Sequence, residues 1–386
     1  MNFAVIGCGM LAQGQHLPNI SASEHMGLHT CCDLSADTLE RCREKFQPKN
    51  TTSDFREAVR DPEVEAICLA TTEALRLPVI EAAAEVGKPL FTEKPLAATL
   101  KEAVAIQRTV HGSGIPFCIG HNRRCSPAMV DAHRLFRQHM ENPKVSPWRW
   151  DREGDNRPAR PEEGTPAAWV RVNDDYASWK AWVYEGEKYG HGPILWEMTH
   201  HVDLCNWFLQ SEPVEVMAME TGLYLHSFTI RYASGALATI TSSANGSFGY
   251  SKELHEFSGE AGFVAVHHMV EVITAGMEGA PRRTVYPVTD DAYPGVGREG
   301  GFNGWLAKRD AGCSDAVESG DHSRVLRCEP DKGHAHMLEA FVQEIRGERG
   351  PVCGVDDAVL ATRVCLAAIA SARERRMVRL EEIRPD

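Results

Sequence analysis

The first 120 residues alternate short apolar runs with longer stretches of helical periodicity. Apolar runs lie at residues 2–7, 27–33, 64–72, 88–95 and 116–122, and helical patterns at 10–20, 35–46, 74–87 and 99–114 separate them. Continuous apolar strands that alternate with helices are typical of a parallel sheet covered on both faces. The pattern therefore predicts an α/β domain, a Rossmann-type doubly wound parallel sheet, over residues 1–122.

The hydrophobic pattern changes after residue 122. Residues 126–140 have the apolar spacing of one helix, whereas runs at 214–220, 225–244 and 255–268 alternate apolar and polar positions between Gly-containing turns. This alternation predicts an open, mainly antiparallel sheet. Residues 336–380 predict two amphipathic helices and a short strand. We expect a second α/β domain over residues 123–386, with an irregular Gly- and Pro-rich insertion at about 276–331.

Composition and charge narrow the classes of function. The 386 residues carry a formal net charge of −13, which argues against nucleic acid or an anionic membrane as the main partner. No apolar run approaches the ~20 residues of a membrane span, and the first residues enter a strand without the pattern of a signal peptide. The 12 Cys include no CxxC pair, which favours reduced thiols and a cytoplasmic protein. Candidate His pairs lack acidic or thiol partners at ligand spacing, so no metal is predicted.

A Gly-rich turn of sequence GCGMLA joins the first predicted strand to the first helix. In a GxGxxA turn the first Gly permits the tight turn and the second lets backbone N–H groups approach a pyrophosphate. The Ala allows close packing of the helix on the strand. The predicted cofactor contacts in this turn are Gly7, Gly9, Met10, Leu11 and Ala12.

Two further strand ends carry candidate cofactor contacts. Asp33 ends the second strand, where an acid accepts hydrogen bonds from the ribose hydroxyls of a dinucleotide. Leu34 follows it in place of an Arg, which favours NAD, with NADP as the alternative. Thr71 and Thr72 end the next strand, where they either contact the cofactor or cap the following helix.

The triplet Glu93-Lys94-Pro95 follows an apolar strand. A Lys at the carboxyl end of a parallel strand projects toward the place where open α/β sheets bind ligands. Next to a nicotinamide, its ammonium can hydrogen-bond a reacting hydroxyl and stabilise alkoxide charge, while Pro95 fixes the turn. Glu93 is expected to contact ribose or carboxamide groups. From the local sequence alone, a solvated surface Lys is an equal alternative.

Four segments together resemble the glucose-fructose oxidoreductase, inositol dehydrogenase and rhizopine-catabolism family (Gfo/Idh/MocA). They are "VIGCGMLAQ", "EKPLA", "GHNRR" and "GPILWEMTHHVDLCNWFL", in the order and spacing of that family. The resemblance extends over the whole chain to the closing helix and strand. It implies an NAD(P)-dependent oxidoreductase whose catalytic lysine is Lys94, and whose broad sheet face forms a homodimer or homotetramer.

The resemblance also implies an acid–base His in an H-x-x-D pattern, which His200 and Asp203 match, with His201 as a competitor. A His titrates near neutral pH, so it can take and return a hydroxyl proton. The chain departs from the family where inositol dehydrogenases carry an Asp four residues before the His, because Trp196 stands there. Other branches of the family carry the acid three residues before the His, where Glu197 stands, so Glu197 is the candidate third member of a Lys–acid–His triad. Arg76 and Glu73 are further departures, which put the positioning of the nicotinamide in doubt.

The remaining predicted contacts lie at the domain junction and in an aromatic stretch. Asn122 is expected to contact cofactor and Arg123 substrate, with surface linker residues as the alternative. Residues 147–196 are dense in Trp and Tyr, whose ring faces pack on the C–H faces of sugars. Tyr176, Lys180 and Asp203 complete the predicted substrate contacts, together with Lys94 and His200.

The sequence thus predicts a dehydrogenase that oxidises a secondary hydroxyl of a sugar, glycoside or cyclitol, or reduces the ketone. A glycosidase or hydratase that retains its NAD and works through a transient keto intermediate is the first alternative. A non-catalytic dinucleotide-sensing protein is the second. The identity of the sugar and the reacting carbon are left open by the sequence.

Overall fold

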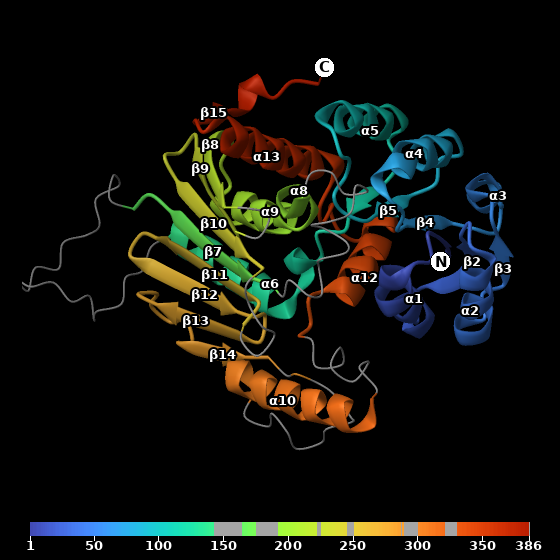
Figure 1. The fold of residues 1–386 in the computed structure, drawn as a ribbon, viewed down its shortest axis with the longest axis horizontal. Coiled ribbons are helices and arrows are strands. Elements are labelled where there is room, and N and C mark those ends of the chain that lie inside the picture. The colour runs from blue at the N-terminus through green and yellow to red at the C-terminus, as the bar shows by residue number, and fades with distance from the viewer. Residues whose placement is uncertain are drawn as a thin grey trace, which may run out of the picture.

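The chain forms two sheets with helices packed between them (Figure 1). This computed structural model describes residues 1–142, 164–174, 192–221, 225–244, 251–286, 288, 300–320 and 330–385. Within these residues, no helix combines the length and apolar character that crossing a membrane requires. Of the predicted site residues, Tyr176 and Lys180 lie outside the described part of the chain.

The N-terminal sheet has six parallel strands in the order β3-β2-β1-β4-β5-β6. The strands are β1 (Asn2–Ile6), β2 (Gly27–Cys32), β3 (Asn50–Thr52), β4 (Ala66–Leu69), β5 (Leu90–Thr92) and β6 (Phe117–Ile119). Their crossover helices are α1 (Leu17–Ala22), α2 (Ala36–Phe46), α3 (Phe55–Arg60), α4 (Arg76–Glu85) and α5 (Leu100–Ser113), and a π-helical turn, Ala12–His16, precedes α1. The order reverses between β1 and β4, which is the switch point where doubly wound sheets bind ligands. The predicted α/β class is confirmed.

Local sequence signals account for most of these boundaries. Ser35 caps α2 by accepting the N–H of Thr38 at 3.2 Å, as such an N-cap residue should. Gly114, at φ +68°, ends α5, whereas Gly112 lies inside the helix. The sequence pattern did not indicate β3 or α3, because one is a polar three-residue strand and the other a six-residue helix.

The second sheet has nine strands in the order β14-β13-β12-β11-β7-β10-β9-β8-β15. Its strands are β7 (Ala167–Asn173), β8 (Pro213–Thr221), β9 (Leu225–Tyr232), β10 (Leu237–Ser243), β11 (Glu253–Gly259), β12 (Gly262–His267), β13 (Glu271–Ala275), β14 (Arg283–Val285) and β15 (Val378–Arg379). Every neighbouring pair is antiparallel except β7 and β10, which run parallel. The sheet is therefore mixed and mainly antiparallel, as predicted.

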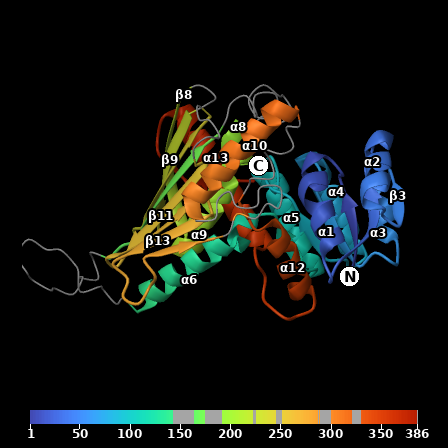
Figure 2. The same ribbon diagram turned by 90° about the horizontal axis from the view of Figure 1, so that it is seen from below.

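Helices from distant parts of the chain cover the face of this sheet that points toward the N-terminal domain. They are α6 (Pro127–Glu141), α8 (Gly192–Trp196), α9 (Met198–Leu209) and α13 (Val355–Glu374). In both ribbon views they lie between the two sheets (Figures 1 and 2). The core beneath them includes Phe136, Phe208 and Phe257, and the rings of Phe208 and Phe257 stack at 3.7 Å.

One helix of the C-terminal half belongs to the core of the N-terminal domain. Residues of α12 (His334–Ile345) are buried against the parallel strands, and Phe341 lies 6.3 Å from the ring of Phe91 on β5. The backbone N–H of Ile119 in β6 donates to the carbonyl of Cys353, just before α13. Figure 1 shows α12 beside α1 and β5.

The expectation of an irregular segment at 276–331 was wrong for part of it. Arg283–Val285 form β14, and Gly301–Ser319 form the 19-residue helix α10. Gly301, Gly304 and Gly312 weaken its helical pattern, because Gly has low helix propensity. The helix is anchored by tertiary contacts, since Phe302 stacks on His267 at 4.1 Å and Trp305 is buried against His268.

Candidate active site

The GCGMLA turn lies at the carboxyl end of β1, at the switch point of the parallel sheet. Gly7 has φ +88°, and a Cβ there would lie 2.7 Å from the carbonyl oxygen of Ala70, which follows β4. Only Gly tolerates both this backbone conformation and this close approach. A Cβ on Gly9 would meet nothing within 4 Å. The open space over Gly9 fits the pyrophosphate of a dinucleotide.

Asp33 is held against this turn by two backbone hydrogen bonds. One carboxylate oxygen accepts the N–H of Cys8 at 2.8 Å, and the other accepts the N–H of Ser35 at 2.9 Å. Each oxygen keeps a further lone pair that a ribose hydroxyl can use. The geometry thus fits a dinucleotide, with Asp33 oriented before a ligand arrives.

The ends of β4 and β5 are tied together by a buried guanidinium. Arg76 at the start of α4 donates to the carbonyl oxygens of Thr71 and Lys94, both at 3.2 Å. Thr72 stands before the turn at Glu73–Leu75 and makes no side-chain capping bond there. The capping alternative for Thr72 therefore has no support in the hydrogen bonds, and its side chain remains a candidate for cofactor contact.

Glu93 lies beneath the candidate site in a fully enclosed position. Its carboxylate accepts from His16 at 2.9 Å and from the backbone N–H of Lys94 at 3.1 Å. A Cβ on Gly120 would lie 2.9 Å from the same carboxylate, so Gly at this position leaves it room. Burial would raise the pKa of Glu93, but His16 and Lys94 outweigh burial and hold the pKa at about 2. Glu93 is thus an ionised internal anchor.

Lys94 leaves β5 and reaches the junction of α8 and α9. Its Nζ donates to the carbonyl oxygen of Trp196 at 2.8 Å and to Oε2 of Glu197 at 3.1 Å, and it lies 4.1 Å from the centroid of the Trp196 ring. The Lys94–Pro95 peptide is cis. Lys94 is not the solvated surface charge of the alternative reading, because only 10% of its side chain is exposed.

Glu197 is the centre of a buried network of charges. Its Oε2 pairs with Lys94, and its Oε1 pairs with Arg123 at 2.9 Å and with Lys252 at 3.2 Å. Arg123 in turn makes a two-pronged contact with Glu253 at 2.8 and 2.6 Å. Three cations, Lys94, Arg123 and Lys252, therefore converge on the carboxylate of Glu197.

These cations govern the protonation of the network. Burial would raise the pKa of Glu197, but Lys252, Lys94 and Arg123 hold it well below its usual range. Burial lowers the pKa of Lys94, and Glu197 and Glu93 oppose this effect. Lys94 is accordingly an ammonium whose proton is held less tightly than that of a solvated Lys.

His200 lies in α9, one turn after Glu197, and is 3% exposed. Burial lowers its pKa well below the usual range, and the positive charges of Arg123 and Lys94 lower it further. Among the described residues, its Nδ1 has no hydrogen-bond partner. His201, the competing candidate, is bonded through Nδ1 to Nε2 of His255 at 2.9 Å, and its Nε2 likewise has no partner there. His200 is therefore a neutral imidazole with a ring nitrogen available for proton transfer.

Asp203 is separated from this network by its own partners. Arg124 donates hydrogen bonds to both carboxylate oxygens of Asp203, at 2.7 and 2.6 Å. Nδ1 of His121 lies 3.1 Å from one of these oxygens. The ring of His121 contacts that of His200 edge-on, with centroids 5.6 Å apart. Asn122 is likewise engaged within the protein, because its amide donates to the carbonyl of Lys332 at 2.7 Å.

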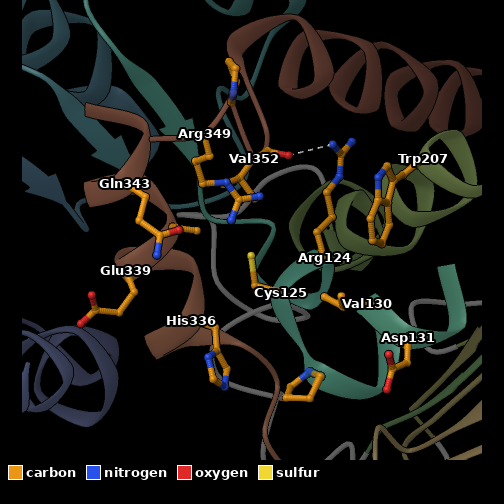
Figure 3. A pocket seen from close by; sticks show the side chains of 13 residues that line it. Arg124, Cys125, Val130, Asp131, Trp207, His336, Glu339, Gln343, Arg349 and Val352 are labelled. Atoms are coloured by element: carbon orange, nitrogen blue, oxygen red, sulfur yellow. Dashed lines mark hydrogen bonds between the residues drawn. The ribbon is translucent and has the colours of Figure 1, made fainter. Parts of the chain in front are cut away.

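A cavity of about 630 Å³ has Arg124 among its lining residues (Figure 3). Side chains of α6, α9 and α12 line it, and Arg124 donates to the carbonyl of Val352 at its edge. Trp207 and Arg349 face each other across it (Figure 3). None of the predicted catalytic or cofactor-binding residues lines this cavity.

Sequence reasoning missed several charged residues of the site. Lys252 and Glu253 enter β11, and His121 and Arg124 flank the predicted pair at the domain junction. One available signal was the charged pair directly before the alternating run that forms β11. A second was a His and an Arg inside the quoted GHNRR segment.

Two side chains next to the site lie close enough to a carboxylate to suggest a metal, namely His201 and His255 with Glu253. Glu253 is already paired with Arg123, and the two imidazoles bond each other. Among the described residues, Nε2 of His201 and Nδ1 of His255 are buried without a hydrogen-bond partner.

Comparison with known protein families matches both halves of the chain. Residues 1–121 match the model of an oxidoreductase family with an NAD-binding Rossmann fold, and residues 167–265 match the GFO/IDH/MocA C-terminal domain. A myo-inositol 2-dehydrogenase of Thermotoga maritima is 22% identical over 99% of each chain.

Solved structures share the whole fold. An oxidoreductase from Agrobacterium radiobacter, in complex with NAD+, L-tartaric acid and magnesium, superposes with a TM-score of 0.75 at 16% identity, covering 100% of this chain and 99% of that one. A scyllo-inositol dehydrogenase from Lactobacillus casei, with bound NAD(H) and scyllo-inositol, gives 0.70 at 16% identity over 99% of both chains.

Proposed function

Because the chain belongs to the GFO/IDH/MocA family of NAD-binding oxidoreductases, we propose that it oxidises a secondary hydroxyl of a sugar, glycoside or cyclitol. The reverse reaction reduces the corresponding ketone. The observation that carries this proposal is the buried cluster of Lys94, Glu197 and His200 at the carboxyl edge of the parallel sheet. It combines an ammonium and a neutral imidazole near the end of a sheet whose turn fits a dinucleotide.

Each residue has a distinct part in the proposed reaction. When bound, the nicotinamide supplies the acceptor for the hydride that leaves the carbinol carbon. Lys94 hydrogen-bonds the reacting oxygen and stabilises the negative charge that develops on it. His200, neutral because it is buried beside Arg123 and Lys94, accepts the hydroxyl proton and returns it in the reverse direction. Glu197 positions Lys94 through their contact at 3.1 Å.

The chemistry of the substrate follows from the same cluster. Arg123 has five N–H donors, of which those on Nε and Nη2 bond Glu253 and Glu197, so its Nη1 donors suit the vicinal hydroxyls of a polyol. The names of the relatives, inositol and sugar dehydrogenases, support this class. The carbon that reacts and the stereochemistry are not part of the proposal.

We also propose that the chain forms a homodimer or homotetramer through the outer face of the nine-stranded sheet. Trp169 of β7 is 47% exposed and Met219 of β8 is 70% exposed. Large apolar side chains on an exposed sheet face are typical of interaction surfaces. Sedimentation of the wild-type chain and a Met219→Glu variant tests the assignment, which fails if both sediment as monomers.

The test of the reaction is a screen of inositols, aldoses, polyols and glycosides for NADH formation with the purified chain. We expect one substrate class to yield NADH in proportion to the substrate consumed. A Lys94→Met variant should bind NAD within about threefold of wild type and lose about 10²–10³-fold in kcat. Turnover of a glycoside without net NADH would contradict the proposal and support an NAD-retaining lyase or glycosidase.

A further inference from the structure

A second buried lysine belongs to the charge network and has no part in the proposed reaction. Lys252 stands at the start of β11 and is 10% exposed at its side chain. Its Nζ lies 3.1 Å from Oδ1 of Asp174, which follows β7, and 3.2 Å from Oε1 of Glu197. We propose that Lys252 is a positioning residue that acts on Lys94 through Glu197. This inference rests on the proposed function of Lys94.

The two oxygens of Glu197 divide the cations between them. Oε2 faces Lys94, whereas Oε1 faces both Arg123 and Lys252. Arg123 is shared with Glu253, which takes two of its hydrogen bonds. Lys252 therefore compensates the charge of Glu197 from the side opposite Lys94.

This arrangement matters because the Lys94 ammonium must bond the substrate oxygen in addition to its two partners within the protein. In the described arrangement its ammonium donates to Glu197 and to the carbonyl of Trp196. During the reaction it must also donate to the substrate oxygen, and a strongly uncompensated carboxylate would hold it back. With Lys252 in place, Glu197 stays ionised and oriented while its pull on Lys94 is weakened.

The charged groups around Lys94 determine whether its pKa rises or falls when Lys252 is replaced. Glu197 and Glu93 raise its pKa, whereas burial and Arg123 lower it. His200 also faces it, and neutral His200 contributes little charge. Without the positive charge of Lys252, the carboxylate charge of Glu197 is less compensated at Lys94, so the pKa of Lys94 rises. The alkaline limb of the rate profile, where Lys94 loses its proton, should then move to higher pH.

Asp174, the second carboxylate paired with Lys252, determines which variants are needed. Burial already raises the pKa of Asp174, so Asp174 can take up a proton when Lys252 is replaced. The direct variant is Lys252→Met. The double variant Lys252→Met with Asp174→Asn removes the pair together and keeps the proposal testable if the single variant does not fold.

The experiment compares pH profiles of kcat and kcat/KM for wild type, Lys252→Met, the double variant and Lys252→Arg. We expect both Met variants to lose about 10- to 100-fold in kcat, as a misplaced catalytic group does, with an alkaline limb at higher pH. Lys252→Arg should keep the alkaline limb at its wild-type pH, because it retains the positive charge. Lys88→Met is the matched control, because Lys88 binds the carbonyls of Val59 and Asp61 away from the network. It should lower stability without moving the limb.

A profile that keeps the wild-type limb in both Met variants would overturn the proposal, because a merely structural Lys252 affects folding and not the titration of Lys94. A second measurement does not need a substrate. Lysine side chains labelled with ¹³C and ¹⁵N, assigned with Lys94→Arg, report the titration of Lys94 by NMR. If the chain oxidises none of the alcohols tested, the proposed function fails, and an upward shift of this titration in Lys252→Met still supports the electrostatic coupling.

Discussion

Replacement of Asp203 by Asn separates a structural role from a role in substrate binding. Asp203 lies in α9, three residues after His200, and its side chain is 1% exposed. Arg124 meets both carboxylate oxygens, and it links α9 to the segment that follows β6. The sequence predicted a substrate contact for Asp203, and in the structure Arg124 and His121 contact its carboxylate and connect α9 to the segment that follows β6.

The magnitude follows from the burial and from the pKa of Asp203. Breaking a buried, hydrogen-bonded ion pair by removing one charge costs about 3–5 kcal/mol, because the other charge is left uncompensated. Burial raises the pKa of Asp203, but Arg124 and His121 outweigh burial and lower it from 3.8 to about 2. This fall corresponds to about 2–3 kcal/mol. Since the folded pKa is lowered, that part of the stability is present above about pH 4 and is lost as pH falls toward 2.

The assay is urea unfolding of wild type, Asp203→Asn and Asp357→Asn, at pH 7 and at acidic pH. Asp357 also pairs with Arg124 but is 42% exposed, so its replacement should cost about 1 kcal/mol or less. We expect Asp203→Asn to lower the free energy of unfolding by about 3–5 kcal/mol, with a smaller difference from wild type below pH 3. The substrate KM of the folded variant should change less than about threefold. Wild-type stability combined with a strongly raised KM would refute this reasoning.

Three further predictions concern the cofactor turn and the candidate base. Gly7→Ala should destabilise the fold by more than about 1 kcal/mol because of its positive φ, whereas Gly9→Ala should keep the unfolding midpoint and weaken NAD binding in a fluorescence titration. Asp33→Ala should weaken NAD binding by about tenfold or more and reduce the preference for NAD over NADP, and equal affinity for NAD before and after the change would count against a ribose contact. His200→Asn should lower kcat/KM for oxidation by about 10²–10⁴-fold at unchanged NAD affinity. Since the pKa of His200 is lowered well below 6.5, the acid limb of the wild-type profile should lie below that pH, and a limb above it would contradict His200 as the base.

The sequence predicted the parallel sheet well because its strands are buried on both faces and are therefore continuous apolar runs. Lys94 directly follows such a strand, but a solvated Lys was an equal alternative there, and the resemblance of the four segments to the family led to its prediction as the catalytic lysine. The same reasoning could not find Lys252, since its partners Asp174 and Glu197 are 78 and 55 residues away along the chain. Long-range pairing of charges leaves no periodic signal in a single sequence.

The sequence predicted an irregular segment where α10 lies, for a related reason. Its Gly residues lower the helical signal, and the contacts that stabilise it, those of Phe302 and Trp305 with His267 and His268, come from a neighbouring hairpin. His200 and His201 also differ in contacts that the sequence does not reveal, because His201 bonds His255 through Nδ1 whereas the ring of His200 contacts that of His121. Tertiary contacts outweighed local propensity in each case.

The packing of α12 against the parallel sheet has a consequence for how the chain is made. Residues 1–121 emerge from the ribosome long before Met337, Phe341 and Cys353, which complete the same hydrophobic core. Until then one edge of β6 lacks the Cys353 carbonyl that its Ile119 N–H binds. The nascent dinucleotide domain therefore exposes apolar surface and an open strand edge while about 230 more residues are synthesised, an interval in which chaperones have most to bind.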